Sequence, residues 1–134
     1  MTAMSKARSI VESQGVFSSV PVKGATTILQ GALVVTSSKL ARPGYTATGL
    51  TVVGVAEETV VNGGADGAAK VLAKRGTFKF SNLASDPITA GSETQDCYVV
   101  DDQTVAATDG TGTRSKAGKI IQVEADGVFV RVGY

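Results

Sequence analysis

The sequence lacks histidine altogether and has a single cysteine, Cys97. Without histidine there is no imidazole base, no Ser-His or Cys-His couple and no histidine ligand for a metal ion. One cysteine excludes both an internal disulfide and a zinc site built from several thiolates. Because these absences remove the commonest catalytic and metal-binding chemistries, we expect no enzyme activity, no cofactor and no metal site.

An excess of charge of one sign is also missing, since 13 Lys and Arg residues stand against 12 Asp and Glu residues. Nucleic acids and anionic membranes attract proteins that carry a local excess of cations. No apolar run approaches the roughly 20 residues that cross a bilayer as a helix. The first residues, "MTAMSKARSIVESQ", lack the apolar middle of a signal peptide. We therefore expect no nucleic-acid partner, no membrane partner and synthesis in a reducing cytoplasm.

Aromatic residues are few, with 4 Phe, 3 Tyr and no Trp, whereas there are 16 glycines. Short segments rich in Val and Thr lie between turn signals, which predicts a single all-β domain of about seven or eight strands. Both faces of "LTVVGVA" are apolar, so we expect a subunit interface to cover the second face. The strands are expected within residues 30–38, 49–58, 68–76, 76–80, 97–108 (two strands around a four-residue turn), 119–124 and 127–132.

The C-terminal stretch "KIIQVEADGVFVRVGY" predicts a β-hairpin. Ile121 and Val123 would share one face of the first arm, and Asp126-Gly127 would form the turn. The second arm alternates, with Phe129 on the face opposite a row of valines. That row consists of Val128, Val130 and Val132.

The stretch "DGTGTRSKAGKI", Asp109 to Ile120, combines glycines, hydroxyls and basic residues as phosphate-binding loops do. A P-loop, however, has four residues between its first glycine and Gly-Lys, followed by Ser or Thr and a helix. Here five residues separate Gly112 from Gly118-Lys119, and Ile120 continues into a strand. We interpret the stretch as a polar connection. Its basic side chains, Arg114, Lys116 and Lys119, are expected to face solvent or the carboxylates of a partner.

Acidic pairs and the lone thiol give no better catalytic candidate. Asp101-Asp102 and Asp109 lack the ligand spacing of a calcium loop, and adjacent aspartates in turns usually cap backbone N–H groups. Glu57-Glu58 lie on a strand, where neighbours point to opposite faces and cannot flank one substrate bond. Cys97 lies in the apolar run "CYVV". A buried thiol is the main interpretation, and a reactive thiol is the alternative, although it has no activating neighbour.

Several segments together resemble a family of small phage structural proteins, the capsid cement or head-decoration proteins, including those of lambda-like phages. The segments are "GLTVVGVAEETVVNGG", "GTFKFSN" and "CYVVDDQTVAATDGTGTRSKAGKIIQVEADGVFVRV". The likeness covers about residues 24–134 and is strongest from Cys97 to Val132. It implies a compact β-barrel-like domain of the β-tulip type, at residues 21–134, preceded by an extended arm at residues 1–20.

The resemblance also implies a role. Proteins of this family form homotrimers on the exterior of the phage head, at local threefold positions between subunits of the major capsid protein, and they cement the shell. The expected partners are therefore the major capsid protein and further copies of this chain, in a virion assembled in the bacterial cytoplasm. The family has no catalytic residues. The alternative role is the base of a head fibre, or a module of the virion that binds a receptor or a glycan.

The N-terminal arm is the candidate for contact with the capsid. It begins polar and then carries a set of apolar residues, Ile10, Val11, Val16, Phe17 and Val20. Such a segment could order on docking by adding a strand to a neighbour. A frayed terminus followed by a first core strand fits the residues equally well. Residues 5–13 fit either one or two turns of helix or a flexible arm.

Overall fold

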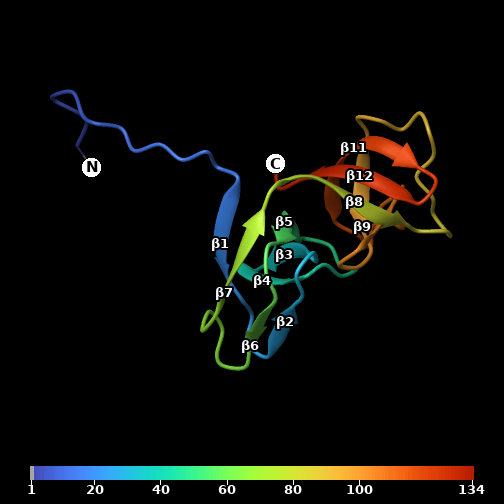
Figure 1. Cartoon of the computed structure of the whole chain (residues 1–134), viewed down its shortest axis with the longest axis horizontal. Helices are drawn as coiled ribbons and strands as arrows, with labels where there is room; N and C mark the ends of the chain where they lie inside the picture. The colour runs from blue at the N-terminus through green and yellow to red at the C-terminus, as the bar shows by residue number, and fades with distance from the viewer. Residues whose placement is uncertain (1) are drawn as a thin grey trace.

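The computed structural model describes residues 2–134, and these form an all-β protein of twelve strands in which none of the described residues is helical (Figure 1). The strands are β1 (Phe17–Pro21), β2 (Thr26–Ile28), β3 (Leu33–Ser37), β4 (Leu40–Pro43), β5 (Thr51–Ala56), β6 (Val60–Asn62), β7 (Lys70–Lys74), β8 (Gly76–Asn82), β9 (Asp96–Val99), β10 (Thr104–Ala106), β11 (Lys116–Glu124) and β12 (Gly127–Val132). The predicted all-β, barrel-containing fold is confirmed.

The first half of the chain builds a five-stranded antiparallel sheet in the order β1-β7-β5-β3-β4. An isolated bridge between Val22 and Ala41 links the chain after β1 to β4, so the sheet curls towards closure. The pair β2-β6 lies across its end. Together these elements enclose one apolar cluster, which includes Ile28, Val34 and Val71, all fully buried.

The second half forms a closed barrel in the order β10-β8-β12-β11-β9. Only the β8–β10 pair is parallel. The valine row of the predicted hairpin, at positions 128, 130 and 132, points into this barrel and is fully buried. Phe80 joins this core, while Phe78 and Val123 pack at its edge. The predicted inward face of β12 is therefore confirmed.

The first arm of that hairpin differs from the prediction. Ile120 pairs with Val130, but Gln122 pairs with Phe129, so Ile121 is the extra residue of a β-bulge. A bulge shifts the alternation of side chains by one residue. Ile120 is consequently buried and Ile121 is 45% exposed. The tight turn is Ala125-Asp126, one residue earlier than the expected turn.

The two halves meet back to back along β3 and β5. Leu33 faces the barrel core and its neighbour Val34 faces the other cluster. Val55 packs on the barrel side and Ala56 on the opposite side. The second apolar face of "LTVVGVA" therefore packs in large part against the barrel of the same chain, so most of its burial does not depend on a second subunit.

Close main-chain contacts at Gly54 and Gly133 flank Arg75, the residue through which the chain passes from one half to the other. Only Arg75 separates β7 from β8. A side chain at Gly54 would meet the Lys74 carbonyl oxygen at 2.5 Å, and one at Gly133 would meet the Val53 carbonyl oxygen at 2.9 Å. Both glycines also have positive φ, 145° and 89°, where branched side chains are strained. The backbone around Gly54 and Gly133 therefore leaves no room for a side chain.

Several elements were not expected from the sequence. The three-residue strands β2 and β6 and the four-residue strand β4 were missed. Residues 17–20 of the expected arm lie in β1, so the part of the arm outside the sheets ends at Val16. The rest of the arm runs away from the body as an extended chain (Figure 1). Of the two conformations left open for residues 5–13, the helix is not the one adopted.

Candidate functional site

The five apolar residues expected to contact the capsid lie in three different environments. Ile10 and Val11 lie on the extended arm and are 78% and 97% exposed. Val16 is half-buried at the root of the arm, and Phe17 opens β1 with 51% exposure. Val20 packs against the apolar cluster of the five-stranded sheet. Only Ile10, Val11 and Phe17 therefore offer substantial apolar surface to a partner.

The side of β1 opposite β7 has no paired strand, although β4 approaches its far end, where Val22 bridges Ala41. Its backbone hydrogen bonds to β7 begin at the Val16 carbonyl, and alternate residues of an antiparallel strand make such bonds. The N–H groups of Phe17 and Ser19 therefore point towards the open edge. Pro21 has no N–H and ends the available stretch. This edge can accept one short extended segment from another chain.

The outer face of the β1–β7 pair adds apolar surface beside this edge. The residues Val71 and Ala73 point into the core, so the alternate residues Leu72 and Lys74 point outwards. Leu72 is 38% exposed. The Lys74 ammonium lies 5.7 Å from the centre of the Phe17 ring, within the range of a cation–π contact. Phe17 is thus held at the root of the arm.

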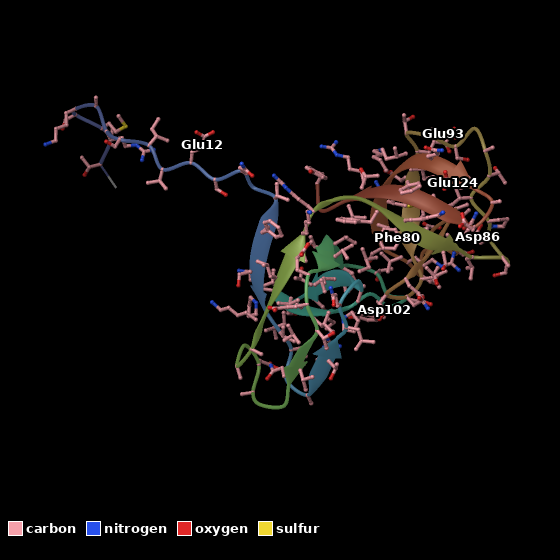
Figure 2. All side chains as sticks on the ribbon, viewed as in Figure 1. Glu12, Phe80, Asp86, Glu93, Asp102 and Glu124 are labelled. Carbon is pink, nitrogen blue, oxygen red and sulfur yellow. The ribbon has the colours of Figure 1, made fainter. Side chains whose placement is uncertain are left out.

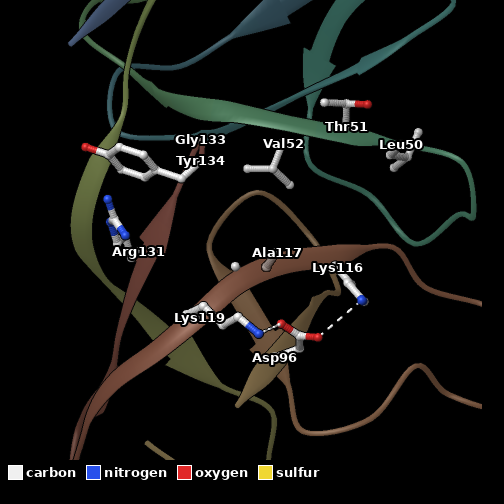
Figure 3. A pocket seen from close by; sticks show the side chains of 11 residues that line it. Leu50, Thr51, Val52, Asp96, Lys116, Ala117, Lys119, Arg131, Gly133 and Tyr134 are labelled. Atoms are coloured by element: carbon white, nitrogen blue, oxygen red, sulfur yellow. Dashed lines mark ion pairs between the residues drawn. The ribbon is translucent and has the colours of Figure 1, made fainter. Parts of the chain in front are cut away.

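A groove of about 300 Å³ lies between β5 and β11, where the two halves of the protein adjoin (Figure 3). Leu50 and Val52 line it from the sheet, and Ala117 lines it from the barrel. Tyr134 closes one end. We name this cavity the β5–β11 groove. Its volume is at the small end of the range for ligand pockets.

Cations outnumber anions along the β5–β11 groove. Lys116 and Lys119 both pair with Asp96, at 3.2 and 2.7 Å, and their side chains are 68% and 58% exposed. Hydrogen bonds from Lys119 and then Lys116 hold the pKa of the Asp96 carboxyl below its ordinary value. The Arg131 guanidinium lies 3.7 Å from the centre of the Tyr134 ring. Of the charged residues that line the groove, three are cations and Asp96 alone is an anion.

The glycine-rich stretch forms a turn that leads into β11, as expected for a connection. The N–H groups of Thr113 and Arg114 both donate to the Asp109 carbonyl, at 2.9 and 3.0 Å. Arg114 does not face solvent, because its side chain is 15% exposed and pairs with Asp86 at 2.9 Å. Thr108 donates a hydroxyl hydrogen bond to the same carboxylate at 2.6 Å. The turn is therefore fastened to the loop that contains Asp86.

The other residues considered for chemistry lie apart from one another. Asp101 caps the N–H of Gln103 at 2.9 Å, as expected for an aspartate in a turn. Cys97 is fully buried, and burial raises the pKa of its thiol to about 12. Glu57 and Glu58 are exposed in the bend that follows β5, and not on the strand where they were expected. Among residues 2–134, no group of three or more His, Cys, Asp and Glu side chains is close enough to hold a metal ion.

The β5–β11 groove was not anticipated from the sequence. Lys116 and Lys119 were recognised only as basic residues of a loop, and Asp96 and Tyr134 were not considered. The spacing of the two lysines gives no signal by itself, because a bulge between Lys116 and Gly118 sets their directions. Asp96 reaches them from β9 through strand pairing that a local pattern does not reveal.

No helix in the described part of the chain is long and apolar enough to cross a membrane. Comparisons with models of protein families, with curated proteins and with solved structures gave no match to this chain.

Proposed function

We propose that the protein is a structural component of a phage particle, a cement protein that binds the exterior of the head and stabilises its shell of major capsid protein. The observation that carries the proposal is the combination of a rigid all-β body with an extended arm whose Ile10 and Val11 are uncovered. Figure 2 shows the arm side chains, including Glu12, away from the body. Apolar side chains presented in this way gain free energy when a partner covers them.

The root of the arm supplies the proposed contact with the shell. The open edge of β1 offers the N–H groups of Phe17 and Ser19, and Phe17 adds its half-exposed ring. A segment of the capsid protein that pairs with this edge would gain main-chain hydrogen bonds and side-chain burial together. This mode of docking needs no cofactor and no catalytic residue.

The number of copies in the homotrimer determines how tightly it binds the shell. An interface of standard size buries about 800 Å² per partner. When three copies act as one homotrimer at a local threefold position, later contacts become intramolecular, and avidity rises by about 10² to 10⁴. The trimer binds assembled shells and not dispersed subunits, so binding shifts the equilibrium towards the intact particle.

The test uses heads assembled without this protein. Added protein should bind them to saturation in sedimentation assays and should raise the temperature at which they release DNA. Antibody label should then cover the head evenly in negative-stain images. Label confined to a fibre or to the tail would replace the proposal with the attachment role, and heads that bind none of the protein would contradict both.

Deletion of residues 2–14 tests the arm within this function. In the head-bound trimer a partner, the shell or an adjacent copy, covers Ile10 and Val11, which is worth about 1.5 kcal/mol or more for each side chain. A change of about 1.4 kcal/mol alters an affinity tenfold. The apparent Kd for heads should therefore rise by about a hundredfold. The matched control replaces Thr2 and Ser5 with Ala, which leaves the apolar residues in place. Undiminished binding of the shortened chain would remove the arm from the mechanism.

A further inference from the structure

We propose that Ile10, Val11 and Glu12 of one copy dock in the β5–β11 groove of an adjacent copy, so that the arms tie the copies into a ring. The inference rests on the proposed function only for the number of copies in that ring. It names the surface of this chain that receives the arm, and it leaves the edge of β1 and Phe17 for the shell.

The first argument is the match of apolar surface. Val11 is 97% exposed and Ile10 is 78% exposed, so the chain itself leaves two adjacent aliphatic side chains in water. The β5–β11 groove has an aliphatic lining, made by Leu50, Val52 and Ala117, and is open to solvent. Aliphatic side chains that enter the groove would displace water from these apolar walls.

The second argument is the match of charge at Glu12; the cations of the arm, Lys6 and Arg8, come before the apolar pair. Asp96 neutralises only part of the charge of Lys116 and Lys119, and both lysine side chains are more than half exposed. Glu12 follows directly after the apolar pair in the arm. An extended segment that places Val11 on the groove's lining can bring the Glu12 carboxylate to these lysines. A carboxylate beside two exposed ammonium groups is favourable, and salt weakens the attraction.

The third argument is the direction of the arm, which favours a neighbour over the groove of the same copy. The arm leaves the body at Val16, whose carbonyl accepts a hydrogen bond from Arg75. The Arg75 guanidinium also lies 4.6 Å from the centre of the Tyr134 ring, so these two side chains stand between the root of the arm and the groove. From there the arm runs away from the barrel (Figure 1). The five residues after Val11 span at most about 18 Å, so the neighbouring copy has to lie close to the root of the arm.

An arm that leaves one surface and docks on a different surface of the next copy is a heterologous contact. Repetition of such a contact closes into a ring when the rotation between copies permits it. Each copy then gives one arm and receives one. The arm and the groove that form this contact belong to copies of the same chain, so the proposal can be tested with purified protein.

Cysteine pairs test the contact directly. Val11→Cys protein is mixed with Leu50→Cys protein and oxidised, in solution and on heads, while the buried Cys97 stays outside the exchange. We expect disulfide-linked pairs that contain one chain of each variant. The Val11→Cys/Leu50→Cys double variant should yield a closed three-chain species on a non-reducing gel. The matched control pairs Val11→Cys with Leu72→Cys, an exposed position outside the groove, and should link at least tenfold more slowly.

Three results would overturn the proposal: equal rates for the control pair, internally bridged monomers from the double variant, or no linkage either in solution or on heads. Loss of head binding with linkage intact would instead overturn the proposed function and leave the contact between copies standing.

Charge exchange gives a second readout that needs no cysteine. Glu12→Lys should weaken self-association about tenfold, Lys116→Glu in the other copies should restore it, and Lys70→Glu, outside the groove, should not.

Discussion

The buried side chain of Asn62 should be the most sensitive polar position in the first half of the protein. It is 2% exposed at the end of β6. Its amide nitrogen donates to the carbonyls of Val22 and Ala65, at 2.9 and 3.0 Å, and its oxygen accepts from the Gly64 N–H at 3.0 Å. These bonds tie the turn after β6 to the chain that follows β1.

Replacement of Asn62 by Ala removes these three bonds, together with a longer one to the Lys23 carbonyl at 3.3 Å, and leaves their partners without them. Each hydrogen bond contributes about 1 kcal/mol net, and a buried group left unpaired costs more. We therefore expect Asn62→Ala to lower the free energy of unfolding by about 3 kcal/mol. For a chain of this length that corresponds to a fall in Tm of about 10 °C.

Urea unfolding followed by circular dichroism measures this loss. The matched control is Val61→Thr, which keeps a β-branched side chain at the neighbouring position, where 68% of the residue is exposed. A surface substitution of this kind should change stability by no more than about 0.5 kcal/mol. If Asn62→Ala cost less than about 1 kcal/mol, the side chain would not be holding the turn, and the account of this part of the core would be wrong.

Three further predictions concern the barrel. Because Cys97 is buried and its pKa is raised to about 12, iodoacetamide at neutral pH should label it only after unfolding; rapid labelling of folded protein, seen by mass spectrometry, would restore the case for thiol chemistry. Gly118→Ala would push a methyl group into the Arg131 carbonyl and should cost about 3 kcal/mol in urea unfolding, whereas Gly63→Ala, with open space around it, should be nearly neutral. Hydrogen bonds, chiefly from the Thr108 hydroxyl, lower the pKa of Asp86. Its contribution to the free energy of unfolding is therefore present above about pH 4 and is lost as the pH falls further. The urea midpoint of Asp86→Asn should differ less between pH 7 and pH 3 than that of the wild type.

Local patterns were enough to predict the fold class and most of the longer strands. The row of valines in β12 follows a period of two, and one face of the strand is buried, so pattern and structure agree. Ile121 shows the limit of this reasoning. The bulge that turns it outwards depends on the pairing of β11 with β12, which the pattern of β11 alone does not encode.

The candidate surfaces could be predicted only in part. Ile10 and Val11 were recognised because they are apolar residues in a polar arm. Val20 is also an apolar residue of the predicted arm, but tertiary packing covers it. Arg114 was expected in solvent, yet the Asp86 that buries it lies 28 residues earlier in the chain. The β5–β11 groove depends likewise on contacts between distant strands, which no single segment specifies.

The attachment of the arm to β1 has a mechanical consequence. A pull on the arm enters the body along the axis of β1, while the hydrogen bonds between β1 and β7 run across that axis. The ladder is then loaded in shear, and its bonds must yield together instead of opening one by one from an end. Because β7 continues through Arg75 into β8, the tension passes along the main chain into the barrel.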